Sequence, residues 1–261
     1  MSQIRDVAIN ESKISQLLHS SRMGDSDVSH AIFVISPQTK SRHPAQCKFG
    51  AVSRWALDLL LKEYETRWDN AVAAFYDYIS GMSDTASLRG PVFERQVLNY
   101  LNGMDAEHKF SIRGLTSEQM TWSYRGPIRR FNFLQDLDFI DEITKAVQSR
   151  NPLHLVPLAL NFPVNSILYD PNEALTCIQI TISRKHHILV SGLQRIRSWL
   201  KRDTRLAGLL PLEERPWRFI FIVPSDEASF EMQRLEGDTQ GEWAGKVQQY
   251  VLGLDVVGKK E

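Results

Sequence analysis

Cysteine is scarce in this sequence, and neither sign of charge predominates. Cys47 and Cys177 are the two cysteines among 261 residues, and Cys177 lies within an apolar stretch. Such a pair does not make the disulfide framework of a small secreted domain, so we expect buried thiols and a reducing compartment. The 31 basic and 31 acidic side chains cancel. A nucleic-acid partner would therefore have to be held by a local basic patch rather than by the field of the whole molecule.

Long apolar runs and several catalytic motifs are missing as well. No run approaches the roughly 18 apolar residues of a membrane span, and the opening residues MSQIRDVAINESK lack the basic-then-apolar order of a secretion signal. We expect an intracellular protein without a membrane partner. The pattern GxxxxGK(S/T) does not occur, nor do GxSxG and HExxH. This chain alone therefore cannot hydrolyse nucleotides by the P-loop route.

Apolar residues make up 43% of the chain, which is enough for a large core. Periodicity predicts strands over 30–37, 108–115, 120–126 and 217–224, a loop over 38–49, and helices over about 52–67, 70–79, 91–102 and 134–147. Two further helices are expected, one opened by a capping box of Ser191 and Gln194 and one over 242–254. The order of these elements predicts an α/β fold with a small mixed sheet flanked by helices.

The stretch from Phe162 to Arg202 organises the rest of the chain, because it predicts a strand, a turn, a second strand, a polar elbow and a basic helix. Side chains alternate along a strand. Gln179 and Thr181 therefore share one face of the second strand, and the isoleucines between them point to the other face. A polar pair at this spacing, beside a turn that carries Asp170, has the layout of an acidic, metal-dependent nuclease core.

Two carboxylates are candidates for holding a cation near this polar pair. Glu94 borders the apolar stripe of its predicted helix, and Asp170 ends the strand before the turn. A metal-dependent phosphodiesterase needs carboxylates for Mg²⁺ and polar groups for the attacking water. In that interpretation Glu94 and Asp170 hold Mg²⁺. Gln179, with Thr181 beside it, positions a water or a phosphate, and Lys185 stabilises the developing charge.

Each of these residues also has an interpretation without chemistry. Glu94 could be a solvated helix residue, and Asp170 before Pro171 is ordinary turn chemistry. Gln179 and Thr181 could be polar residues of a half-exposed strand.

The basic helix gives a stronger signal than the individual polar residues. Seven Lys or Arg residues lie between Arg184 and Arg205, against one acid, Asp203. Such a helix could lie along a phosphate backbone, each contact adding salt-dependent affinity. The predicted nucleic-acid contacts are Arg184, Arg195, Arg197, Lys201 and Arg202. The alternative is a solvated outer face without a partner.

Eight short stretches from about Ser29 onward follow one another in the order of a known family. They are SHAIFVISP, RGPVFERQVLNYL, FSIRGL, NSILYDP, IQITISRKHHI, GLQRIRSWL, PWRFIFIVP and WAGKVQQYVLGL. In these stretches the chain resembles the C-terminal part of the Crinkler and retrotransposon-hot-spot (RHS) proteins of fungi, oomycetes and trypanosomes.

The resemblance implies a restriction-endonuclease-like domain of the PD-(D/E)XK type over 51–261. Residues 1–50 would be an N-terminal extension that looks like the tail of a P-loop NTPase module. It also implies Mg²⁺, a nucleic-acid partner with DNA first, an NTPase module acting in trans, and delivery to the nucleus. The family's acidic helix residue falls at Glu94, its aspartate at Asn165, and its Gln-x-Thr followed by histidine at Gln179, Thr181 and His186. Asn165 carries no charge, so one metal ligand of the pattern is missing.

Three functions remain open from the sequence. The first is a Mg²⁺-dependent nuclease with a degenerate site, and the second is a pseudo-nuclease that binds nucleic acid as an effector or recognition module without cutting it. The third is a protein-interaction scaffold with no affinity for nucleic acid. Binding to nucleic acid that survives without metal and weakens with salt would support the second, whereas metal-dependent turnover would dismiss it.

Overall fold

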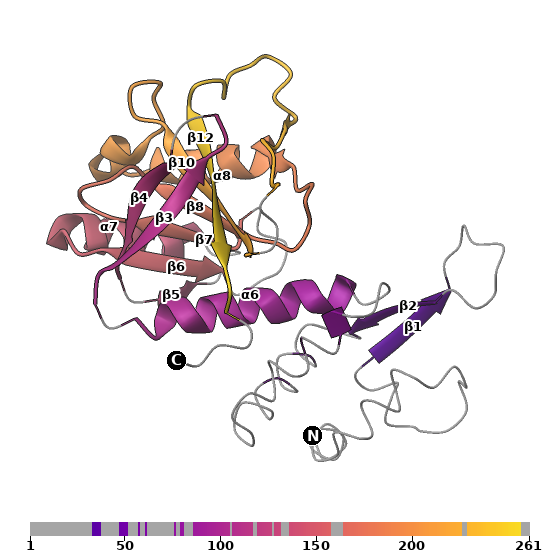
Figure 1. Ribbon diagram of the computed structural model, residues 1–261. Coiled ribbons are helices and arrows are strands. Elements are labelled where there is room, and N and C mark those ends of the chain that lie inside the picture. Colours follow the sequence, from indigo (N-terminus) through magenta and orange to yellow (C-terminus); the bar gives the residue numbers. More distant parts are fainter. Residues whose placement is uncertain are drawn as a thin grey trace. The chain divides into compact units, whose positions relative to one another are not determined.

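The computed structural model (Figure 1) describes residues 33–37, 47–51, 57, 61, 76, 79–80, 86–104, 106–116, 119–126, 128–131, 136–157, 164–225 and 229–256. They belong to two compact units, 1–96 with 255–261, and 97–254. The helices predicted over 52–67 and 70–79 lie largely outside these residues. Among the described residues, no helix is long and apolar enough to cross a membrane.

The first unit contains a two-stranded antiparallel sheet of β1 (Phe33–Pro37) and β2 (Cys47–Ala51). Of the strand predicted over 30–37, residues 33–37 are confirmed, and 30–32 lie outside the described residues. The loop predicted over 38–49 was too long, because β2 begins at Cys47. Helix α6 (Ala86–Asn102) crosses from the first unit into the second. It begins earlier than expected and keeps Pro91 inside. It ends before Gly103 as predicted, with the Gly103 N–H donating to the Asn99 carbonyl at 3.0 Å.

The second unit is built on an eight-stranded mixed sheet with the order β4-β3-β12-β10-β8-β7-β6-β5. The strands are β3 (His108–Gly114), β4 (Gln119–Tyr124), β5 (Ile128–Phe131), β6 (Leu153–Pro157), β7 (Ser166–Tyr169), β8 (Thr176–Ile180), β10 (Trp217–Pro224) and β12 (Val247–Leu254). The mixed α/β class is confirmed, although the sheet is larger than expected. A separate parallel pair joins β9 (Ile188–Leu189) to β11 (Leu235–Glu236).

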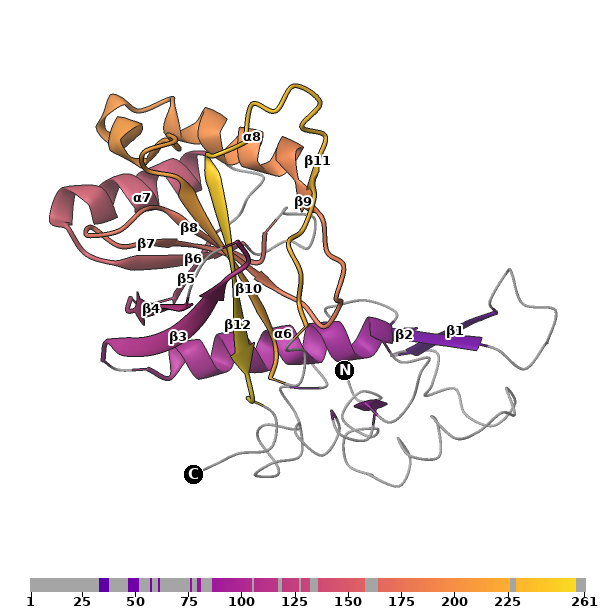
Figure 2. The same ribbon diagram turned by 45° about the horizontal axis from the view of Figure 1, so that its top comes forward.

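Helices α7 (Asp136–Ser149) and α8 (Val190–Leu200) cover one face of this sheet, together with the short 3₁₀ helix η2 (Thr204–Leu209) (Figure 2). The predicted apolar face of α8 is confirmed, since Leu193, Ile196 and Leu200 are all buried. The predicted capping box is wrong. The N-cap is Leu189, and no side chain caps the helix there.

The C-terminal helix predicted over 242–254 is also wrong, because Val247–Leu254 is strand β12. It pairs in parallel with β10 along its whole length. Tyr250, Val251 and Leu252 are buried in succession, as expected for a strand covered on both faces. Gly245 has a φ of +74°, which a helix does not accept. The helix-like spacing of the aromatic and β-branched residues here was coincidental.

The sheet has to curl, because its two outermost strands are neighbours in the sequence. Strand β4 ends at Tyr124 and β5 begins at Ile128, a span of at most about 14 Å. In a flat sheet, eight strands about 4.8 Å apart would separate the two margins by about 34 Å. The segment 119–131 therefore pairs first with β3 and then with β6.

A buried chain of hydrogen bonds holds the curl. The Tyr124 hydroxyl is hydrogen-bonded to His154 Nδ1 at 2.9 Å, and His154 Nε2 to the Ser166 hydroxyl at 2.7 Å. These residues come from β4, β6 and β7, and all three are buried. Burial raises the pKa of Tyr124 and lowers the pKa of His154 to about 3. His154 is therefore a neutral structural residue at physiological pH.

The depressed pKa of His154 predicts a loss of stability in acid. Below about pH 6.5 the unfolded chain takes up a proton at this histidine, whereas the folded chain does so near pH 3. This residue lowers the free energy of unfolding by about 1.4 kcal/mol per pH unit between these values. In His154→Gln that part of the slope should disappear in urea titrations across this range. Tyr124→Phe should keep this pH dependence, but its free energy of unfolding should be about 1 kcal/mol lower at every pH. If His154→Gln and wild type show equal slopes, His154 is not the source of the acid sensitivity.

Candidate functional site

The hairpin of β7 and β8 forms the base of the predicted site. Its register pairs Ser166 with Ile178, which places Asn165 opposite Gln179 at one end. The Asn165 N–H donates to the Ile178 carbonyl at 2.9 Å, and the Asn165 side-chain oxygen accepts the Ile180 N–H at 2.7 Å. Asn165 thus continues the hydrogen-bond ladder beyond the strand with its side chain. Asn165 therefore has a structural role in the hairpin.

Gln179 and Thr181 lie at the same end of the hairpin and are both buried. Alternation places them on the face of Cys177, a member of the core under α7 and α8. The Thr181 hydroxyl accepts the Ser183 N–H at 3.0 Å. The structure therefore brings Asn165, Gln179 and Thr181 together, as a neutral polar cluster. The half-exposed strand considered as an alternative is not what forms here.

The loop after β8 is held by Gln233, a residue that the sequence analysis missed. The Gln233 side-chain oxygen accepts the His186 N–H at 2.7 Å, and its amide donates to the Arg184 carbonyl at 3.1 Å. Lys185 between them is exposed. Burial and the neighbouring His187 lower the pKa of His186, so its imidazole stays neutral to a lower pH than that of an ordinary histidine. An isolated glutamine far along the chain gives no sequence signal for this role.

Asp170 lies at the opposite end of the hairpin from Gln179. Leu168 pairs with Thr176, so roughly five residues of strand, or about 16 Å, separate the turn from Gln179. The structure does not bring Asp170 and Gln179 into one site. The Asp170 carboxylate instead accepts the Asn172 N–H at 2.8 Å. This is the ordinary turn that was the alternative interpretation of Asp170.

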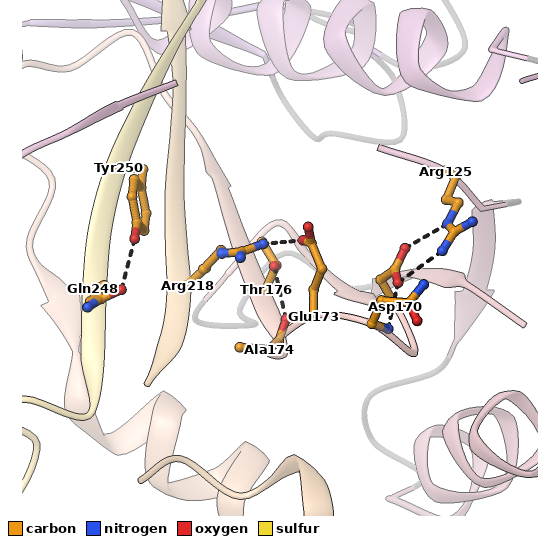
Figure 3. A network of polar contacts seen from close by, with 9 residues as sticks. Arg125, Asp170, Glu173, Ala174, Thr176, Arg218, Gln248 and Tyr250 are labelled. Carbon is orange, nitrogen blue, oxygen red and sulfur yellow. Dashed lines mark hydrogen bonds and ion pairs between the residues drawn. The ribbon is translucent and has the colours of Figure 1, made fainter. Parts of the chain in front are cut away.

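Arg125 forms an ion pair with the Asp170 carboxylate. Its Nε lies 2.8 Å from Oδ2 and its Nη2 lies 3.3 Å from Oδ1, a bidentate ion pair (Figure 3). Burial raises the pKa of Asp170, but Arg125 and the Asn172 N–H outweigh it, so the pKa lies below its usual value. Asp170 is therefore an ionised residue that clamps the chain after β4 to the end of β7.

Glu94 lies on α6 in the first unit and is half-buried. That Glu94 lies beside Gln179 and Thr181 of the hairpin stays a prediction. In the described part of the chain, no group of three or more His, Cys, Asp or Glu side chains could hold a metal ion.

The predicted nucleic-acid contacts have different surroundings. Arg197 is half-buried, with its guanidinium 2.5 Å from Glu242 and over the Trp243 ring. Arg184, Lys201 and Arg202 are exposed. Arg195 is exposed as well, and it lies over Trp199 at 5.0 Å from the ring centroid. Helix α8 and the turn that follows it therefore form an outer face with three exposed cations, Arg195 on the helix and Lys201 and Arg202 just past its last residue, Leu200.

A cleft that the sequence did not predict opens at the Asp170 end of the hairpin. It has a volume of about 610 Å³ and is lined by Asp170, Glu173, Arg215 and Arg218 among others. Figure 3 shows Arg218 of β10 paired with Glu173 of the turn. The Tyr250 hydroxyl donates to the Gln248 side-chain oxygen at 2.8 Å. The cleft lies at the beginnings of β8, β10 and β12, and the neutral polar cluster lies at the far end of β8.

No family model, curated protein or solved structure matches this chain.

The hydrogen bond from Asn165 predicts a pair of stability effects. Asn165→Ala leaves the Ile180 N–H without its acceptor and should lower the free energy of unfolding by about 1 to 3 kcal/mol. Asn165→Asp keeps an oxygen at that position and should lose less. Urea denaturation of the three proteins measures the difference. Equal losses in the two variants would show that the side-chain oxygen does not stabilise the hairpin end.

Proposed function

We propose that this chain is a nucleic-acid-binding module of the restriction-endonuclease-like type that contacts backbone phosphates without cleaving them. The observation that carries the proposal is the outer face of α8. Arg195, Lys201 and Arg202 are exposed on it, and the residues between them on this face are polar and uncharged. A row of cations without interleaved acids suits contacts with a phosphate backbone.

Two acids near this face have arginine partners of their own. Asp203, the acid that follows the helix, is bound by Arg205, whose Nη2 lies 2.6 Å from its carboxylate. Glu242 is bound by Arg197 on the inner flank. Each of these two acids is therefore paired with an arginine other than Arg195, Lys201 and Arg202.

The hairpin end supports the endonuclease-like interpretation and argues against cutting. In the family pattern an aspartate stands at the Asn165 position, and Gln-x-Thr stands at the Gln179 and Thr181 positions. The hairpin register places Asn165 opposite Gln179, and none of the three side chains carries a charge. Asp170 cannot replace the missing acid there, because Arg125 holds it at the other end of the hairpin. Metal-assisted hydrolysis needs negatively charged ligands at the reacting centre.

Charge reversal on α8 tests the binding proposal. Changing Arg195, Lys201 and Arg202 to Glu should weaken binding to labelled DNA at least about tenfold. The slope of the logarithm of the binding constant against the logarithm of the salt concentration should become smaller in magnitude by about 0.9 for each lost phosphate contact. Fluorescence anisotropy at several salt concentrations measures both. The matched control changes Lys109, Lys145 and Arg234, exposed cations outside α8, to Glu. If both triple variants lose affinity equally, the effect is one of net charge. Unchanged affinity in the α8 variant would favour the protein-interaction scaffold.

The proposal also predicts the outcome of a cleavage assay. Single- and double-stranded DNA and RNA incubated with the protein and Mg²⁺ or Mn²⁺ should stay intact, with wild type and with Glu94→Ala alike. Binding should be the same with and without the metal. Metal-dependent cleavage by wild type that disappears in Glu94→Ala would instead establish the nuclease, with Glu94 in its centre.

A further inference from the structure

The cleft beside Asp170 has the size and the walls of a small-molecule site. Its volume of about 610 Å³ lies within the usual range of ligand pockets, about 300 to 1,000 Å³. Half-buried apolar side chains line it, among them Met120, Val147, Leu209, Leu210 and Pro216. Such walls suit an apolar body rather than a sugar or a bare ion.

Most charges around the cleft already neutralise each other. Asp170 is paired with Arg125, and Glu173 with Arg218. Arg205 holds Asp203 through two nitrogens, the Nε at 2.9 Å and the Nη2 at 2.6 Å. None of these pairs needs a ligand.

Arg215 differs from the other arginines of the cleft. Within the described part of the chain no carboxylate lies within ion-pair distance of it, and its guanidinium contacts a backbone carbonyl, that of Leu210, at 3.4 Å. The side chain is exposed, so it stands at the rim. The cleft therefore combines apolar walls with one unneutralised guanidinium, a planar donor that pairs well with a carboxylate.

We propose that the cleft binds a small organic carboxylate with an apolar or aromatic body, whose carboxylate pairs with Arg215. A phosphate monoester is the less suitable ligand, because its second charge would need a second unneutralised cation. This site is separate from the α8 face and does not depend on nucleic-acid binding.

Gly208 provides a way to block the cleft. It lines the cleft, and a Cβ placed on it would meet no atom within 4 Å. A large side chain can therefore be added there without a clash at its base. Gly208→Trp should fill the cleft, whereas Gly208→Ala, the matched control, should leave it open.

The ligand test uses four probes on the wild-type protein: phenylacetate, its neutral analogue phenylacetamide, phenyl phosphate, and acetate, which has no apolar body. Trp217 lines the cleft, and its indole N–H donates to the Leu209 carbonyl at 2.7 Å. The NMR signal of this indole N–H, assigned with Trp217→Phe, reports binding. We expect saturable binding of phenylacetate at least about tenfold tighter than of the other three probes. No binding of phenylacetate, or equal or tighter binding of phenylacetamide or phenyl phosphate, overturns the proposal.

The variants locate the site. Arg215→Gln should weaken phenylacetate binding at least about tenfold, while Arg234→Gln, an exposed arginine outside the cleft lining, should leave it unchanged. Gly208→Trp should abolish binding and Gly208→Ala should retain it. Binding that survives both Arg215→Gln and Gly208→Trp would overturn the proposal. If a variant does not fold, as thermal unfolding would reveal, the wild-type probe series still decides.

Discussion

The second unit depends on the segment 119–131, which supplies both margins of its sheet. It leaves β3 at Tyr124 and joins β6 at Ile128, so the sheet cannot lie flat. At the bend, Gly126 has a φ of +125°, and a Cβ there would come within 3.1 Å of the Pro152 backbone. Both the conformation and the close approach require glycine. Arg125 and Tyr124 on either side of β4's end then fasten the bend through Asp170 and His154.

Local patterns predicted most of the elements because burial on one or both faces leaves a period in the sequence. The continuous apolar run of β10 and the 3.6-residue stripe of α8 are examples. The helix predicted over 242–254 was wrong because the segment fits both the helical period and the strand period. Trp243, Val247 and Val251 fit a helix, yet β10 offers a full parallel register that outweighs local preference. Periodicity within 242–254 carries no information about that partner.

The candidate site was predicted in part for the same reason. Strand alternation placed Gln179 and Thr181 on one face, and the hairpin register brought Asn165 to them. The partner of Asp170 could not be predicted, since Arg125 lies 45 residues earlier and meets it only because the sheet curls. The cleft was missed because its walls come from β4, the hairpin turn, η2, β10 and β12.

The bend at Gly126 also affects the sheet margin that β4 offers to other molecules. An open sheet exposes unpaired N–H and C=O groups at its margins, onto which strands of other molecules can add. A foreign strand laid along β4 would reach, past Tyr124, the backbone of Pro152 and Leu153, which already lies against Gly126. The length of strand to which another molecule could pair is then limited to the six residues of β4. The glycine that lets the sheet curl therefore also shortens the edge on which aggregation could begin.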